Sequence, residues 1–189
     1  MDVVSADPDA AAVIAARTGD TDAFSTLVER HQRRVVAHLR RLVGEHDALD
    51  LGQETFVRAW QRLALYDPTY RFIGWLLVIA TRLALNHRRR LRSELPALED
   101  CDLAPANGPT PHDVHDRVED ARHQLARLES ILDGLGPQAR MLYELRFRQE
   151  LGLDELAAHF SVSEGAIKVR VHRLRQALIT AMEDGHGAR

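Results

Sequence analysis

Apolar residues recur at every third or fourth position over most of this 189-residue chain, as they do along the buried face of an α-helix. A first, Ala-rich helix is expected over residues 9–17, ending at Gly19. Residues 20–22 offer N-cap chemistry for a second helix, which Gly44 ends. The apolar stripe of this second helix consists of Phe24, Leu27, Val28, Val35, Leu39 and Leu42.

A third helix is expected to begin at residues 47–50, and its stretch 50–60 is the most informative part of the chain. The apolar side, which should be buried, consists of Leu51, Thr55 through its methyl group, Phe56, Ala59 and Trp60. The remaining sides carry Asp50, Gln53, Glu54 and Arg58. The stretch has no metal-ligand spacing, nucleophile or phosphate-binding loop. It is therefore typical of a helix that packs on its own domain and holds a partner.

The next helix is expected over residues 71–92, after a turn at 66–69. Its first half is core-like, whereas the whole helix carries six arginines and no acidic residue. Residues 93–120 then hold four of the seven prolines and a net charge of −7, against +3 for residues 1–92 and +1 for residues 121–189. This composition predicts an acidic, flexible, Pro-rich linker between two domains.

Helical periodicity returns at residues 121–135 and continues, after Pro137, to Arg148. Residues 153–175 have the pattern of a helix-turn-helix, in which a short helix, a turn at 160–162 and a cap at Ser163 precede a second helix. The second helix should bury Ile167, Val171, Leu174 and Leu178, which share one face.

The opposite face of that helix is basic and suits the major groove of DNA. The candidate contacts are Ser163, Glu164, Lys168, Val169, Arg170, His172, Arg173 and Arg175. Glu164 can accept from a cytosine amino group, and Lys168 or Arg170 can donate to guanine or phosphate. The alternative is an ordinary helical hairpin with a solvated basic face.

Composition fits an all-α protein of two small helical domains, because aromatic residues make up only 5% of the chain. The single cysteine, Cys101, excludes an intramolecular disulfide and a Cys-rich zinc site. Its spacing from His112 and His115 is poor for a metal, so no metal or other cofactor is expected. We also expect no enzyme, since no acid–base pair has suggestive spacing. No apolar run reaches membrane-spanning length, so the chain should be cytoplasmic without membrane insertion.

Four segments, in this order and spacing, resemble bacterial RNA polymerase sigma factors of the extracytoplasmic-function (ECF, group IV) type. Residues 19–24 resemble the start of their region 2, and residues 47–60 resemble region 2.2. Residues 75–90 resemble regions 2.3 and 2.4, and residues 135–178 resemble region 4. The resemblance implies an initiation factor that binds core polymerase and recognises the −35 and −10 promoter elements.

The resemblance also implies roles for particular residues. The region 2.2 helix would dock on the β′ clamp helices, with its dock or supporting core formed by Asp47, Asp50, Gln53, Glu54 and Phe56. The −10 element would be opened and its flipped bases captured by Tyr66, Tyr70, Arg82, Asn86, Arg89 and Arg90. Trp75 is favoured as a core residue over a stacking platform. Region 4, with the helix-turn-helix, would read the −35 element and touch the β flap.

The resemblance also implies a path for the linker and one further partner. The acidic linker would thread the polymerase cleft as an RNA mimic, unless it is a plain solvated tether. An anti-sigma factor, commonly a helical domain, would block the core-binding surfaces.

This sequence also departs from the family. Leu49 stands where Glu is usual, and Gly52 replaces a larger apolar residue at about 0.5–1 kcal/mol of helix stability. Arg82 stands where Asn is common, and Asn86 stands where Asp is common. Both departures affect which −10 sequence the protein would prefer.

Two other functions are possible. A DNA-binding regulator that acts without polymerase would leave the helix at 50–60 without a purpose. A purely structural helical adaptor would leave the basic face of the second helix unexplained.

Overall fold

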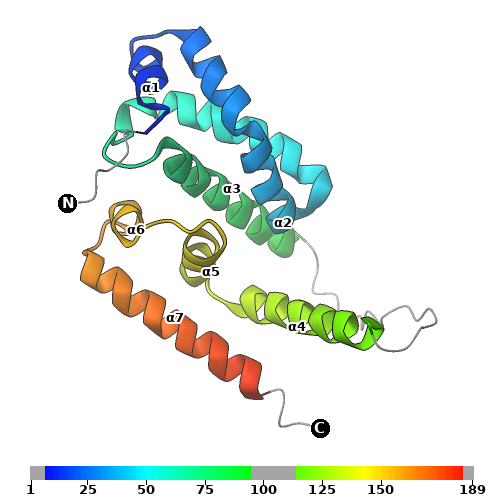
Figure 1. The fold of residues 1–189 in the computed structure, drawn as a ribbon. Coiled ribbons are helices and arrows are strands. Elements are labelled where there is room, and N and C mark those ends of the chain that lie inside the picture. The colour runs from blue at the N-terminus through cyan, green and yellow to red at the C-terminus, as the bar shows by residue number, and fades with distance from the viewer. Residues whose placement is uncertain (1–6, 95–113, 185–189) are drawn as a thin grey trace.

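The structure is a computed structural model of the chain and describes residues 7–94 and 114–184. All regular elements in these two ranges are helices, which confirms the all-α prediction (Figure 1). Their bounds are α1 Ala10–Arg17, α2 Thr21–Gln61, η1 Leu63–Leu65, α3 Phe72–Glu94, α4 Val114–Gly134, α5 Pro137–Tyr143, the π-helical turn η2 Glu144–Arg148, α6 Leu153–Phe160 and α7 Glu164–Asp184.

Helix α2 consists of two arms that meet at Gly44, where φ is +85° and ψ is 178°. This positive φ strains any residue with a side chain, so glycine suits the break. Asp20 caps the first arm by accepting from the N–H groups of Asp22 and Ala23, both at 2.9 Å. The break predicted at Gly44 and the cap at residues 20–22 are therefore both confirmed.

The two arms of α2 approach each other closely at Gly52. A Cβ on this glycine would lie 3.1 Å from Val36 Cγ2 of the first arm. A larger apolar residue here would press on the Val36 side chain, so the cost of a helical glycine is offset by close packing of the arms.

Helix α3 is the central element and packs on α2 with one side and on the carboxy-terminal half with another (Figure 1). Leu76, Leu77 and Phe72 of α3 are fully buried. Trp75 packs on Tyr66 and Phe72, with ring centroids 5.5 and 5.8 Å apart. This packing agrees with the prediction that Trp75 belongs to the core.

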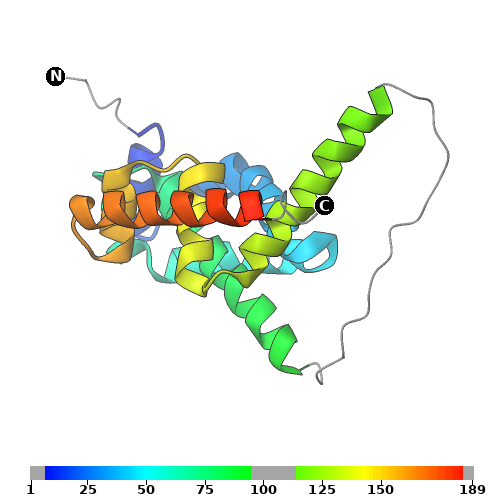
Figure 2. The same cartoon turned by 90° about the horizontal axis from the view of Figure 1, so that it is seen from below.

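The carboxy-terminal half begins with α4, which extends away from α5, α6 and α7 (Figure 2). Helix α4 starts at Val114, within the segment 93–120 that was predicted to be the linker. The rest of the predicted linker, residues 95–113, lies outside the described residues. Cys101 and His112, which were considered as metal ligands, lie in this segment.

The helix-turn-helix prediction is confirmed by α6, a left-handed turn residue at Ser161 (φ +53°) and α7. Ser163 Oγ accepts from the Ala166 N–H at 3.2 Å and caps α7. Ile167 and Leu174 are buried, and Val171 and Leu178 pack against the core as predicted.

Candidate polymerase and nucleic-acid interfaces

The second arm of α2 has an outer face that mixes polar and apolar side chains. Asp50 and Gln53 are exposed, and Glu54 accepts from Arg58 Nη2 at 2.6 Å. Beside them Leu49 and Val57 are about half exposed, at 52% and 55%. An apolar side chain in water favours burial against a partner, so this face suits a protein better than a small polar ligand.

Sequence analysis did not identify the apolar members of this face. Trp60 was assigned to the buried side, yet it is 37% exposed and meets Phe24 edge-on at 4.9 Å. Val57 and Trp60 follow Leu49 by eight and eleven positions. This is a helical spacing, which could have revealed a second apolar stripe.

Two residues predicted for the polymerase dock face elsewhere. Phe56 is buried in the core, so it supports the helix and does not offer a contact surface. Asp47 accepts from His87 Nε2 of α3 at 3.0 Å and so joins α2 to α3. Of the residues predicted for the polymerase dock, Asp50, Gln53 and Glu54 remain available on the outer face of α2.

Tyr66, a buried residue of the loop between η1 and α3, stabilises this loop. This residue is only 3% exposed, so its ring is not offered to a base and its prediction as a −10 contact is wrong for this conformation. Its hydroxyl donates to Tyr70 O at 2.5 Å. Burial and the neighbouring Asp7 raise the pKa of Tyr66 above its ordinary value.

Asp7 ties the amino-terminal segment to the start of α3. Its Oδ2 accepts from the Phe72 N–H at 2.6 Å and lies 3.2 Å from the Tyr66 hydroxyl. The first N–H groups of a helix lack intrahelical partners, so Asp7 caps α3 from a distant part of the chain. No local signal marks this role.

The remaining −10 candidates share the surface of α3. Arg82, Asn86, Arg89 and Arg90 are all exposed, and Arg89 Nη2 lies 3.5 Å from Asn86 Oδ1. Tyr70 lies in the loop before α3, where it is partly buried near His159 of α6. The structure therefore brings the arginines and Asn86 together as a basic, acid-free strip.

The exposed face of α7 carries the residues predicted to read a duplex. Glu164 and Lys168 form an ion pair at 2.8 Å. Val169, Arg170, His172, Arg173 and Arg175 are exposed. None of the described residues pairs with Arg170, Arg173 or Arg175, so these guanidinium groups remain open to phosphate.

Comparison with known families decides what these surfaces belong to. The model of Sigma-70 region 2 matches residues 27–94, and that of Sigma-70, region 4 matches residues 125–178. The ECF RNA polymerase sigma factor SigE of Mycolicibacterium smegmatis is 40% identical over 167 residues, which span 85% of this chain and 63% of that relative. SigW of Bacillus subtilis, also an ECF RNA polymerase sigma factor, is 30% identical over 176 residues, which span 89% and 93%. The chain belongs to the ECF group of sigma-70 factors.

Solved structures agree with this assignment. CnrH, determined in complex with the cytosolic domain of CnrY, has a TM-score of 0.63 and 27% identity and covers 94% of this chain and 99% of its own. The sigma factor RpoE of Bartonella quintana, in complex with the anti-sigma factor NepR, shares the fold at a TM-score of 0.54 and 20% identity, over 88% and 98% of the two chains.

Within residues 7–94 and 114–184, no three His, Cys, Asp or Glu side chains gather as metal ligands. Each helix in these ranges falls short of the length or apolar character that crossing a bilayer needs.

Proposed function

We propose that this sigma factor binds core RNA polymerase, recognises the −35 and −10 promoter elements and directs transcription initiation in the cytoplasm. The observation that carries the proposal is the presence, in one chain and in order, of both a region 2 and a region 4 unit. Initiation factors of this kind are regulatory proteins and not enzymes, which agrees with a surface that offers docking faces.

The polymerase dock is assigned to the outer face of the second arm of α2. Asp50, Gln53 and Glu54 supply its polar contacts, and Leu49 with Val57 supplies apolar area. Such a mixture of an apolar centre and a polar rim is usual in specific protein interfaces. The β′ clamp helices are the proposed partner.

The −10 element is assigned to α3 and the loop before it. Arg82, Asn86, Arg89 and Arg90 would hold the separated strand, with Tyr70 at the loop. Unstacking a base costs a few kcal/mol, which stacking and pocket hydrogen bonds recover. Tyr66 keeps the loop in shape and does not touch the base.

The −35 element is assigned to α7, whose amino-terminal end would enter the major groove. Ser163 and Glu164 lie nearest the base edges, and the basic residues that follow neutralise phosphate. Capped and buried on its inner side, α7 presents these groups from a rigid element, which specific readout requires.

Two polymerase contacts and one regulator complete the proposal. An apolar groove of about 440 Å³ between α5, α6 and α7 is the proposed site for the β flap. It is lined by Leu135, Gln138, Ala139, Leu142, Phe160, Arg170, Arg173, Leu174 and Ala177. The acidic segment up to α4 is assigned to the polymerase cleft. An anti-sigma factor is the proposed regulator, and RpoE of Bartonella quintana was solved in complex with one.

Run-off transcription tests the whole proposal. Purified core polymerase and genomic fragments should yield discrete transcripts only when the sigma factor is added. Core polymerase that is captured by the protein but never initiates would contradict it, and so would duplex binding that needs no polymerase.

A further inference from the structure

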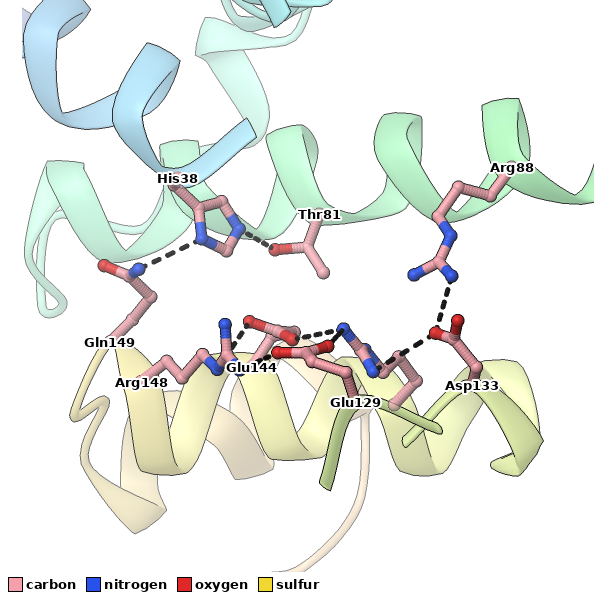
Figure 3. A network of polar contacts seen from close by, with 9 residues as sticks. His38, Thr81, Arg88, Glu129, Asp133, Glu144, Arg148 and Gln149 are labelled. Carbon is pink, nitrogen blue, oxygen red and sulfur yellow. Dashed lines mark hydrogen bonds and ion pairs between the residues drawn. The ribbon is translucent and has the colours of Figure 1, made fainter. Parts of the chain in front are cut away.

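Polar side chains from distant parts of the chain hold α3 at two places. At its middle, Thr81 Oγ1 donates to Leu77 O at 2.7 Å and therefore accepts from His38 Nε2 at 2.8 Å. His38 Nδ1 accepts from the amide of Gln149, in the region 4 half formed by α4–α7, at 3.0 Å (Figure 3). At the start of α3 the partner is Asp7, 65 positions before the residue that it caps. The first group is buried, whereas the second lies beside a loop that DNA would meet.

One carboxylate oxygen of Asp7 joins the two ends of the loop 66–71. Asp7 Oδ2 accepts from the N–H of Phe72, directly after the loop, at 2.6 Å. The same oxygen lies 3.2 Å from the hydroxyl of Tyr66, the first residue of the loop. That hydroxyl also donates to Tyr70 O at 2.5 Å, near the end of the loop. We call these contacts of Asp7, Tyr66, Tyr70 and Phe72 the clasp.

The tip of the loop, by contrast, has no anchor of its own in the core. Asp67, Pro68 and Thr69 are all exposed. They form a turn in which Asp67 Oδ1 accepts from the Thr69 N–H at 2.9 Å and Asp67 O accepts from the Tyr70 N–H at 3.2 Å. The place of this turn relative to α3 therefore depends on the two ends that the clasp joins.

Asp7 is itself held by contacts that do not involve the loop. Its Oδ1 accepts from the Asp9 N–H at 3.1 Å, and its carbonyl accepts from the Ala10 N–H at 2.9 Å. The Asp9 side chain is only 2% exposed and pairs with Arg30 and His31 of α2. The segment before α1 is thus fixed on α2, so Asp7 can act as a support for the loop.

Helix α1 adds a further contact to the same region. Val13 and Ala16 are buried in the core, and Arg17 Nη2 donates to Ala64 O of η1 at 3.2 Å. The match to Sigma-70 region 2 covers residues 27–94, so Asp7 and α1 both lie before it. The clasp therefore joins a part of the chain outside this match to the loop assigned to the −10 element.

We propose that Asp7 is a positioning residue of the −10 site: without touching DNA, it holds the loop 66–71 in the shape that receives a flipped base. The proposal rests on the proposed function, which assigns this loop to the −10 element. Polar groups that recognise a ligand must be held within about 0.5 Å of the productive geometry. A loop that is ordered only on binding spends part of the binding free energy on its own ordering.

Loss of the clasp should reduce discrimination between promoters. A loop without its shape loses the contacts that distinguish the correct −10 bases. A promoter whose −10 bases are replaced lacks those contacts already, so only transcription from the correct promoter should fall. A merely destabilised protein would instead transcribe less from both promoters alike. The ratio of the two rates therefore separates positioning from stability.

Run-off transcription by the holoenzyme at saturating sigma factor measures this ratio. The templates are a promoter fragment and the same fragment with transversions in its −10 element. Asp7→Ala should lower the ratio by about fivefold, the factor that the loss of a typical helix cap represents. Tyr66→Phe keeps the buried ring without the hydroxyl and should lower the ratio similarly. Asp7→Asn keeps an acceptor for the Phe72 N–H and should restore most of it.

Asp20→Ala is the matched control, because it removes a cap of the same kind from the first turn of α2. It should leave the ratio unchanged. Amide hydrogen exchange in the free full-length protein reads the loop directly. Asp7→Ala should speed exchange at the Tyr70 amide, and Asp20→Ala should not.

Two results would overturn the positioning role while the proposed function stands. One is a wild-type ratio that both Asp7→Ala and Tyr66→Phe retain, and the other is an equal loss of the ratio in Asp20→Ala. A wild-type holoenzyme that transcribes both templates equally would contradict the proposed −10 recognition, and the positioning role with it. The two failures are therefore distinguishable.

Discussion

His38 is the buried residue whose charge state most directly affects the contact between the two halves. Burial lowers its pKa to about 3, and three arginines add to the effect: Arg41, Arg148 and Arg34. A proton on Nδ1 would face the Gln149 amide donor, so the ring must stay neutral to keep this contact.

Acid should therefore destabilise the protein through His38. Between pH 6.5 and about 3 the unfolded chain binds a proton that the folded chain excludes, and stability falls by about 1.4 kcal/mol per pH unit. About 2 kcal/mol should be lost from roughly pH 7 to roughly pH 5 in urea unfolding. His38→Asn should remove this part of the slope, and an equal slope in both proteins would contradict the account.

Asp7 should stabilise the amino-terminal half although it lies outside any helix. Asp7→Ala removes the cap of α3 and should cost about 1 kcal/mol. Thermal unfolding measures the loss, and hydrogen exchange should speed up at the Phe72 amide. Glu29→Ala, an exposed change on α2, serves as the control and should be near neutral.

At the scale of elements, α2 combines a strained hinge with close packing of its arms. Gly52→Leu would overfill the space beside Val36 and should destabilise the protein by about 1–3 kcal/mol. Gln32→Leu adds the same side chain on the exposed surface of the first arm and controls for the added apolar area. Equal midpoints of urea-induced unfolding for the two variants would contradict this explanation of Gly52.

The outer face of the second arm should carry the binding of core polymerase. Asp50→Ala with Glu54→Ala, or Leu49→Ala with Val57→Ala, should weaken capture of core subunits by about tenfold or more, as at interface hot spots. Leu49, Asp50 and Val57 are exposed, and Glu54 is partly exposed in a surface ion pair with Arg58, so unfolding should change little. Arg33→Ala on the first arm is the control, and undiminished capture by both double variants would rule out this face.

Helix α7 should show the salt signature of phosphate binding. Alanine at Lys168, Arg170 or Arg173 should weaken binding to a −35 duplex and reduce the salt slope by about one for each phosphate that the variant no longer neutralises. Arg122→Ala, exposed on α4, is the control. An unchanged slope in all three variants would mean that this face does not meet DNA.

The elements themselves could largely be predicted from the sequence because their signals are local. Apolar spacing, the Asp20 cap, Gly44 and Ser163 all act within a few residues. Tyr66 and Trp60 were misplaced because their exposure depends on how α3 and Phe24 pack beside them. The contact between Arg71 and Glu155 could not be predicted, since the two residues are 84 positions apart and nothing local relates them.

At the scale of the whole molecule, α3 lies between the two halves and contacts both. Arg82 and Arg88 of α3 donate to oxygens of His159 and Asp133 in the region 4 half. Of these two arginines, Arg82 is also among the residues proposed to hold the opened strand. Apolar residues of both halves, among them Leu77 and Leu145, belong to one continuous core, so the contact between the halves is apolar as well as polar.

Strand opening at the −10 element is the central claim, and permanganate reactivity of unpaired thymines measures it directly. Core polymerase with the sigma factor should make thymines around that element reactive on a fragment that supports run-off transcription. Core polymerase alone should leave them unreactive, and Arg82→Ala should reduce the signal. Duplex that stays unreactive while the sigma factor and core polymerase are both bound would contradict the account.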